Sequence, residues 1–380
     1  MSATGAIAGG LARWYARHAR DLPWRRQRTP YGVWVAEVML QQTQVKTVVG
    51  YWERWMRALP TIAALAAAAP ARVLRLWEGL GYYHRARRLQ EAARLIVREH
   101  GGRFPTQFDQ ILSLPGVGRY TAGAIASIAF NYPAPILDGN VIRVLSRLYG
   151  IRGDPHRHPA NTRLWGLAAA LVEAVGLGGD GRSGGRGEGE ANPGQLNQAL
   201  MELGALVCLP GQPRCPECPL RRRCVAARSG QAGQLPELPR RPRALARRWL
   251  VLVLEHRGRF LVQQRDGEGV NAHLWQFPNA EATAGDGDPS SLARRLVGMP
   301  VTSATLFHRL THHITRYRIT LEVFRACLPL HARRSAGTGT WRTLAQLDAL
   351  PFSGAHRKIV AALGRQPEPD GRYRGRVRQR

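Results

Sequence analysis

The spacing of apolar residues changes near residue 225, and this change restricts the possible folds more than any other feature. From Leu11 to about Cys224 apolar residues recur every three or four positions, as in "PARVLRLWEGLGYYHRARRLQEAARLIVREHG", which is typical of amphipathic helices. Later runs, "WLVLVLEHRGRFLVQQR" and "YRITLEVFRACL", are typical of strands, the first as a pair about a turn at Gly258. We therefore predict an all-α region followed by a smaller α+β domain.

The boundaries of these regions follow from composition. Residues 226–247 are rich in proline and arginine and are expected to be a linker between domains at residues 1–225 and 248–365. A glycine-rich run at 176–194 is expected to be a flexible loop, and an arginine-rich tail at 366–380 to be disordered. The most apolar run, at 61–70, is too short to span a bilayer, which takes about 20 residues, and no leader is apparent. We therefore expect a cytoplasmic protein that contacts no membrane.

The charge of the chain indicates its kind of partner. Lysine and arginine number 55 against 26 aspartates and glutamates, which gives a net charge of +29. Only Lys46 and Lys358 are lysines. A GC-rich genome can explain arginine in place of lysine, but it does not explain the size of the net charge. This charge favours a polyanionic partner, most simply nucleic acid.

Two glycines precede one of the helical patterns, in "LPGVGRYTAGAIASIAF" at residues 114–130. Glycines just ahead of a helix leave backbone N–H groups open to a phosphate, so we expect Gly116 and Gly118 to dock nucleic acid. Tyr120 follows them directly. Phosphate docking does not require a bulky phenol at the mouth of the helix, so Tyr120 indicates a second role.

Glu37 is the only charged residue in "TPYGVWVAEVMLQQTQV", residues 29–45. Pro30 is suited to start a helix, on which Glu37 shares a face with Val33, Trp34 and Leu40. A carboxyl on such a face loses solvent, which raises its pKa and makes it a candidate proton donor near neutral pH. A core glutamate satisfied by hydrogen bonds is the alternative.

Asp138 stands immediately ahead of the helical pattern in "LDGNVIRVLSRL". Its default role is a helix N-cap, and the helix end would also keep it ionised as a reactive carboxylate. Glu37 as acid and Asp138 as anion would form the pair that cleavage of an N-glycosidic bond requires. Asn140 could orient either group or a water, although turn chemistry explains an Asp-Gly-Asn run equally well.

Four of the five cysteines form one cluster with the spacing C-x6-C-x2-C-x5-C, at Cys208, Cys215, Cys218 and Cys224. Disulfides are rare in cytoplasmic enzymes, so the cluster predicts a metal site. Structural zinc usually takes two short cysteine pairs, and only one C-x-x-C occurs here, so a cubane iron–sulfur cluster is favoured over zinc. The triple arginine at 221–223 adds positive charge, which suggests a structural cluster beside DNA.

The motifs together resemble a known family. "LPGVGRYTAGA" is similar to a helix-hairpin-helix, and with "LDGNVIRVLSR" and the cysteine loop it resembles the endonuclease III superfamily of DNA base-excision glycosylases. Within that superfamily, the resemblance is to the MutY adenine DNA glycosylases, through "LPWR", "TPYGVWVAEVMLQQTQV", "EGLGYYHRAR", "LDGNV" and "LNQALMELGALVC". It runs from about residue 11 to 224 and more weakly to about 365.

The resemblance implies a monomer that binds double-stranded DNA, flips out adenine mispaired with 8-oxoguanine or guanine, and hydrolyses its N-glycosidic bond. Glu37 matches the acid that protonates adenine at N7. Asp138 matches the carboxylate that stabilises the oxocarbenium-like sugar, and Tyr120 and Asn140 match residues around that sugar and its water. The four cysteines match the ligands of one 4Fe-4S cluster.

Other positions match residues that contact DNA. Gln42 and Tyr82 match residues that probe or wedge the duplex beside the lesion. Leu40, Trp24 and Arg25 match pocket and DNA-facing positions, although Leu40 and Trp24 could equally be core residues.

The C-terminal part resembles the Nudix-related domain with which the family reads 8-oxoguanine. An active Nudix hydrolase needs a glutamate-rich helix to hold magnesium, whereas "DPSSLARRLVGMPV" has two arginines and no paired glutamates. We therefore expect no nucleotide hydrolysis. The recognition loop of the family, often Phe-Ser-His, is matched by "LTH" at 310–312, which makes Thr311 and His312 candidate contacts to 8-oxoguanine. The doubled His312-His313 leaves this register open.

Three alternatives remain. An endonuclease III-like enzyme removes oxidised pyrimidines and nicks the strand through a lysine imine, but Tyr120 occupies that lysine position, and no lysine lies between Lys46 and Lys358. Borohydride is therefore expected to trap little enzyme on abasic DNA. A thymine glycosylase acting on guanine mispairs can carry tyrosine there but would lack the second domain. A non-catalytic DNA-binding protein would not explain the uncharged helix around Glu37.

Overall fold

The structure is a computed structural model of the 380-residue chain. It describes residues 2–176, 192–239, 242–265, 267, 271–282, 289–298, 301, 304–314, 316–328 and 339–365. The chain divides into two compact units, the first comprising Met1–Ala68 and Arg88–Arg241, and the second Ala69–Arg87 and Pro242–Arg380. Most of the glycine-rich run and all of the basic tail lie outside the described residues.

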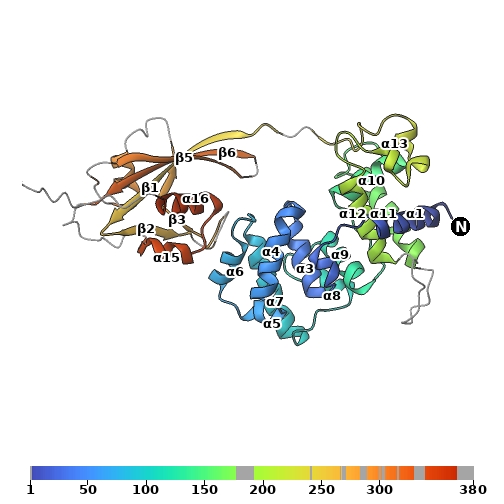
Figure 1. The fold of residues 1–380 in the computed structure, drawn as a ribbon, viewed down its shortest axis with the longest axis horizontal. Coiled ribbons are helices and arrows are strands. Elements are labelled where there is room, and N and C mark those ends of the chain that lie inside the picture. Colours follow the sequence, from blue (N-terminus) through green and yellow to red (C-terminus); the bar gives the residue numbers. More distant parts are fainter. Residues whose placement is uncertain are drawn as a thin grey trace, which may run out of the picture. The chain divides into compact units, whose positions relative to one another are not determined.

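The described part of the first unit is helical, as the apolar spacing predicts (Figure 1). Its helices are α1 (Ala3–His18), α2 (Pro23–Arg26), α3 (Pro30–Leu40), α4 (Val45–Ala58), α5 (Ile62–Ala67), most of α7 (His84–His100), α8 (Phe108–Leu112), α9 (Arg119–Phe130), α10 (Gly139–Tyr149), α11 (Ala160–Gly176), α12 (Pro193–Leu206) and α13 (Val225–Arg228). Two 3-10 turns, η1 (Cys215–Glu217) and η2 (Arg221–Arg223), lie in the cysteine loop.

Helix α3 is the most buried element around the predicted acid. Thr29 caps its N-terminus by accepting from the Gly32 N–H at 3.1 Å, and Pro30 occupies its first turn, as predicted. Every residue from Tyr31 to Met39 is buried. Because α3 packs against α9, the helix that follows the glycine hairpin, Glu37 and Tyr120 are brought together.

In its described residues, the second unit contains α6 (Pro70–Trp77) and a seven-stranded mixed sheet with the order β3-β2-β1-β6-β5, in which β4 pairs with β1 and β7 with β2. The strands are β1 (Leu245–His256), β2 (Arg259–Gln264), β3 (Trp275–Gln276), β4 (Asn279–Glu281), β5 (Ala304–Ile314), β6 (Tyr317–Cys327) and β7 (Thr340–Thr343). Strands β1 and β6 run parallel. The turn between β1 and β2 contains Gly258 at φ +67°, as predicted.

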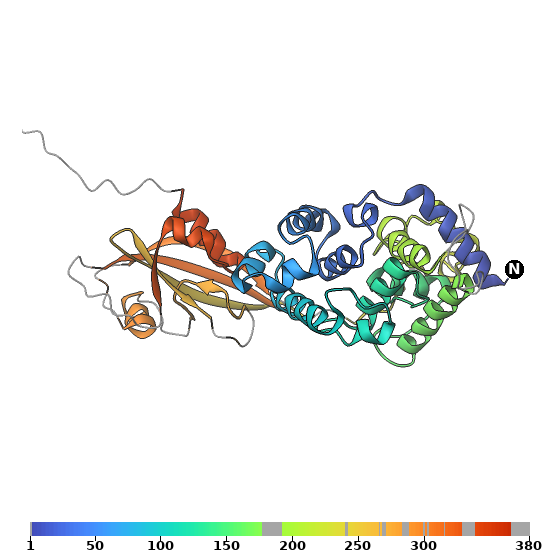
Figure 2. The ribbon, with the colours of Figure 1, turned by 90° about the horizontal axis from the view of Figure 1, so that it is seen from below.

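Helices cover both faces of this sheet. Val251 and Val253 of β1 belong to a core shared with α16 (Gly354–Leu363), whereas Leu252 and Leu254 belong to a core shared with α14 (Pro289–Val297). Figure 2 shows the red α16 and the orange α14 on opposite sides of the strands. Burial on both faces explains why "WLVLVL" is continuously apolar and does not alternate. A further helix, α15 (Leu344–Ala349), follows β7.

Two expectations about segments differ from the structure. The expected linker, 226–247, includes the end of α13 and the first residues of β1, and the first compact unit extends to Arg241. The expected recognition loop at 310–312 lies within β5, where Thr311 is opposite Thr320 and His312 opposite Ile319 of β6. The reason is that β6 pairs with β5 as far as Ile314, so these residues are part of a hairpin and not of a loop. Within the described ranges, each helix is too short or too polar to span a membrane.

Candidate active site

One cavity of the first unit, with a volume of about 920 Å³, brings together most of the predicted site residues. Its walls come from α2 and the segment before it, α3, the start of α4, the segment that joins α3 to α4, α9, α10 and α12. The predicted residues that line it are Trp24, Arg25, Glu37, Leu40, Gln42, Tyr120, Asp138 and Asn140. Residues far apart in the sequence thus meet around one space.

Glu37 is buried in the wall of this cavity and is only 5% exposed. The Tyr120 hydroxyl donates a hydrogen bond of 2.8 Å to Glu37 Oε2. Burial raises the pKa of Glu37 to about 7; the Tyr120 hydrogen bond opposes this shift, and the negative charge of Asp138 adds to it. A carboxyl with this pKa is substantially protonated near neutral pH and can deliver a proton.

Asp138 is the N-cap of α10, as predicted. Its Oδ1 accepts from the Val141 N–H at 2.7 Å, and its Oδ2 accepts from Asn140 Nδ2 at 2.8 Å. Burial raises the pKa of Asp138, while these hydrogen bonds and the charge of Arg143 oppose the rise. The helix end therefore favours the anion, as expected, but burial outweighs it. One residue acts as cap and as cavity carboxylate.

Arg143 on α10 extends this network and was not found from the sequence, where it is one arginine among many. Its NH2 donates to Asn140 Oδ1 at 2.8 Å and to the Gly204 carbonyl at 2.7 Å, and its Nε donates to the Cys208 carbonyl at 2.6 Å. The Arg143 guanidinium thus donates hydrogen bonds both to Asn140 and to Cys208, the first residue of the cysteine cluster.

Glu202 on α12 is a second buried carboxylate that lines the cavity, at 1% exposed. It accepts from Arg20 Nε and NH2, both at 2.8 Å, and from Arg25 NH2 at 2.9 Å. Burial alone would raise its pKa, but the hydrogen bonds from the two arginines bring the pKa of Glu202 down to about 2. Glu202 is the only charged residue in "LNQALMELGALVC", so the reasoning used for Glu37 could have found it.

Gln42 and Tyr82, the predicted duplex probes, both have left-handed backbone conformations. Their φ angles are +58° and +46°. Residues other than glycine rarely adopt such φ angles, and backbone strain of this kind is often found at functional sites. Gln42 is exposed in the first unit, and Tyr82 is 39% exposed in the second.

The glycine hairpin lies outside the cavity. Gly116 has φ +78°, and a Cβ there would lie 2.8 Å from Arg88 Cβ, so a larger residue is excluded. Gly118 is the N-cap of α9, and both glycines are exposed. An exposed helix N-terminus of this form suits a phosphate.

A cavity of about 580 Å³ lies within the second unit. Tyr82 and His312 line it, together with His84, Arg87 and His313. Thr311 is exposed and does not belong to the lining residues. The structure therefore brings Tyr82 and His312 to one cavity but leaves Thr311 outside it.

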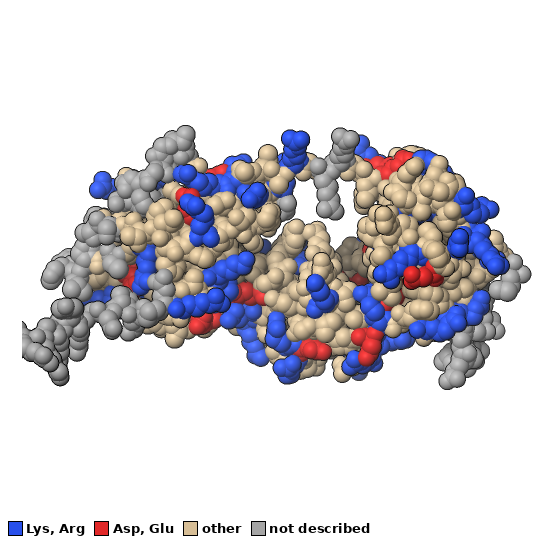
Figure 3. All heavy atoms as spheres, turned by 45° about the horizontal axis from the view of Figure 1, so that its top comes forward, with Lys and Arg blue, Asp and Glu red and all other residues tan. Residues whose placement is uncertain are grey.

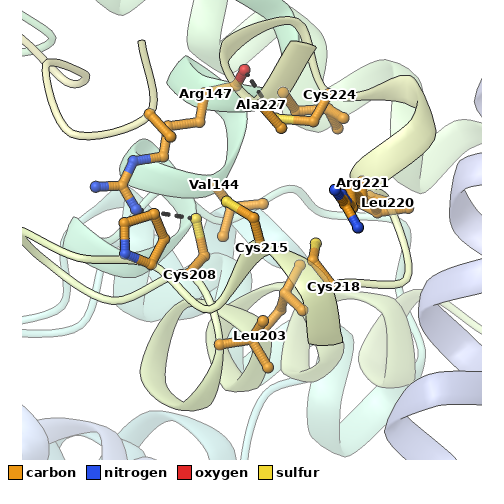
Figure 4. Close-up of a pocket in the computed structure, with 14 residues that line it drawn as sticks. Val144, Arg147, Leu203, Cys208, Cys215, Cys218, Leu220, Arg221, Cys224 and Ala227 are labelled. Atoms are coloured by element: carbon orange, nitrogen blue, oxygen red, sulfur yellow. Dashed lines mark hydrogen bonds between the residues drawn. The ribbon is translucent and has the colours of Figure 1, made fainter. Parts of the chain in front are cut away.

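The four clustered cysteines line one small apolar cavity of the first unit (Figure 4). Arg147, which is 3% exposed, donates from NH1 to Cys208 Sγ at 3.3 Å, and Cys224 Sγ donates to the Arg147 carbonyl at 3.2 Å. Burial raises the pKa of the Cys218 thiol to about 11. Among the described residues, no group of three or more His, Cys, Asp or Glu side chains lies close enough together to hold a metal ion.

Comparisons with known proteins relate both units to known families. Residues 35–170 match the model of the HhH-GPD superfamily of base excision DNA repair proteins, and residues 249–362 match a NUDIX domain. An adenine DNA glycosylase of Buchnera aphidicola (Schizaphis graminum) is 34% identical over 270 residues, which cover 71% of this chain and 73% of the relative. The chain belongs to the adenine DNA glycosylase family. The predicted resemblance is thereby confirmed.

Other relatives of the adenine DNA glycosylase family are longer. The human adenine DNA glycosylase is 49% identical over 230 residues, which cover 58% of this chain and 39% of the human protein. The chain thus spans about two fifths of the human relative. A solved structure, a thermostable thymine-DNA glycosylase, aligns with a TM-score of 0.50 at 27% identity over 60% of this chain and 97% of that one. This supports the helical glycosylase fold predicted for the first unit.

Proposed function

We propose that the chain hydrolyses the N-glycosidic bond of adenine in double-stranded DNA, with adenine opposite 8-oxoguanine or guanine as substrate. The observation that carries this proposal is the hydrogen bond between buried Glu37 and partly buried Tyr120, which lies with Asp138 in a cavity large enough for a nucleoside. Membership of the adenine DNA glycosylase family supports the choice of base.

In this proposal protonated Glu37 gives its proton to N7 of the flipped adenine. The bond between N9 and C1′ then breaks, its electron pair stays with the base, and adenine leaves as a neutral molecule. The positive charge on the sugar develops beside Asp138, whose carboxylate stabilises it. A water bonded to the Asp138–Asn140 pair adds to C1′ and releases a proton, which restores the protonated Glu37.

Recognition of the opposite base is assigned to the second unit. Tyr82 and His312 line a cavity there whose aromatic and imidazole rings suit a purine. Thr311, on the exposed side of β5, remains a weaker candidate. Blue side chains are scattered widely over the face shown in Figure 3, and a net charge of +29 supports binding to DNA phosphates.

We further propose that the four cysteines hold one 4Fe-4S cluster. The donor set consists of four thiols around one apolar cavity, one for each iron. The buried guanidinium of Arg147 beside Cys208 Sγ suits a group that carries negative charge once the thiols ionise. When bound, the cluster supplies a covalent crosslink that fixes the loop from Cys208 to Cys224.

Adenine release from a duplex with one A opposite 8-oxoguanine tests the activity. Glu37→Gln and Asp138→Asn should each lower the single-turnover rate by at least about 100-fold while DNA affinity is kept. Glu53→Gln, on the exposed surface of α4, is the matched control. Full activity in both cavity variants would refute the mechanism, and preferential release of oxidised pyrimidines would favour the endonuclease III-like alternative.

Iron and sulfide analysis of anaerobically purified protein tests the cluster. About four irons per chain and broad visible absorption are expected, and Cys215→Ser should remove both. One zinc per chain, without iron, would refute this assignment.

A further inference from the structure

Lys46 has an unusual place in this chain. Lysine and arginine together number 55, but only Lys46 and Lys358 are lysines. Lys46 is the second residue of α4, is exposed, and lines the cavity that also contains Glu37 and Asp138. The single lysine of the first unit therefore lies on its catalytic cavity.

The other cations of this cavity differ from Lys46 in chemistry. Arg20 and Arg25 are hydrogen-bonded to Glu202, and a guanidinium does not deprotonate in proteins. A lysine carries a primary amine on a flexible four-carbon stem and can attack a carbonyl carbon. Of the cationic side chains that line this cavity, Lys46 alone is capable of covalent chemistry with an aldehyde.

Base excision would create such an aldehyde in the same cavity. The abasic sugar opens to a free aldehyde at C1′, and C1′ is the atom that Asp138 faces during the reaction proposed above. We propose that Lys46 forms an imine with C1′ of the abasic product, an inference that rests on the proposed function. The deprotonated amine attacks C1′, the new C–N bond forms, and the carbinol oxygen leaves as water, so no oxidant or reductant is required.

The imine retains the abasic product in the enzyme and lowers its rate of release. It does not conflict with Tyr120 at the position where a lyase carries its lysine. Tyr120 donates its hydrogen bond to Glu37, whereas Lys46 lines the same cavity from the start of α4. We therefore expect a minor adduct, formed more slowly and trapped in much smaller yield than in a lyase, which agrees with the low trapping expected from Tyr120. This adduct should depend on a single residue.

The test uses the full chain and a duplex with a preformed abasic site opposite 8-oxoguanine, treated with sodium borohydride. Reduction converts the imine into a stable amine that migrates as a crosslinked species. Lys46→Arg keeps the positive charge and should lower trapping at least tenfold, while Lys358→Arg, the matched control on α16, should leave it unchanged. Mass spectrometry should find the adduct on the peptide that contains Lys46.

Equal trapping by wild type and Lys46→Arg would overturn the inference, as would an adduct mapped to the N-terminal amine. A salt-dependent loss of affinity in Lys46→Ala, with no trapping in wild type, would reduce Lys46 to a phosphate contact. Because the substrate is already abasic, these outcomes do not depend on adenine excision. Failure of wild type to release adenine from the A:8-oxoguanine duplex would instead refute the proposed function.

Discussion

Removing the Tyr120 hydroxyl is expected to move the pH dependence of adenine excision upward. This hydroxyl donates to Glu37 Oε2 at 2.8 Å and favours the ionised carboxylate. A hydrogen bond to a charged group contributes about 1.5–3 kcal/mol, and one pKa unit corresponds to about 1.4 kcal/mol. Tyr120→Phe should therefore raise the pKa of Glu37 by roughly 1 to 2 units.

The measurement is kcat/KM for adenine release between pH 5 and pH 10, because its pH dependence reports the ionisable groups of the free enzyme. Glu37 must be protonated to act, so the wild-type rate should fall above about pH 7. In Tyr120→Phe the fall should begin at higher pH, even if the maximal rate is lower. Met201→Leu is the control. Met201 Sδ accepts a weak contact from the same hydroxyl at 3.5 Å, but it is neutral, so its loss should leave the pKa of Glu37 unchanged. A descending limb at unchanged or lower pH in Tyr120→Phe would refute the assignment of Glu37 as the acid.

Three further outcomes follow from the contacts. A Cβ at Gly204 would lie 2.6 Å from Asn140 Cβ, so Gly204→Ala should displace Asn140 and lower the excision rate about tenfold or more without loss of helicity, measured by circular dichroism. The pKa of Glu202 is lowered to about 2, so its carboxylate stabilises the folded state above pH 4.5, and this contribution is lost as the pH falls toward 2. Glu202→Gln should therefore lower the free energy of unfolding by about 3 kcal/mol at pH 7 and by less at pH 3, measured by urea unfolding. Arg143→Met should lower both the excision rate and the iron content, because Arg143 bonds both Asn140 and the cysteine loop.

Much of the catalytic cavity could be predicted because each signal is local. Glu37 is a single charge in an apolar helix, and Asp138 precedes a helical pattern that needs a cap, so neighbouring residues reveal the roles of both. Proline and glycine positions likewise predicted the start of α3 and the turn between β1 and β2. These features depend on a few consecutive residues and on backbone preferences.

The missed features depend on partners far away in the sequence. Arg20 and Arg143 look like any other arginine until the fold places them against Glu202 and Asn140, respectively. The segment at 310–312 became a strand because β6 supplies a pairing partner, which no local motif reveals. Lys46 could be singled out by its rarity, but only the fold shows that it lines the cavity.

Glu37 and Glu202 show what makes one carboxyl an acid and another a permanent anion. Both line the same cavity and both are almost fully buried, at 5% and 1% exposed, yet their pKa values are raised to about 7 and lowered to about 2. Burial disfavours the charge in both, so the surrounding groups are what differ: the donors to each carboxyl and, for Glu37, the negative charge of Asp138. Two arginines hold Glu202 ionised through charge-assisted hydrogen bonds, whereas a neutral phenol donates to Glu37 and leaves most of the desolvation uncompensated. The charged donors at Glu202, set against a neutral donor and the nearby Asp138 charge at Glu37, therefore decide which of the two can protonate a base at neutral pH.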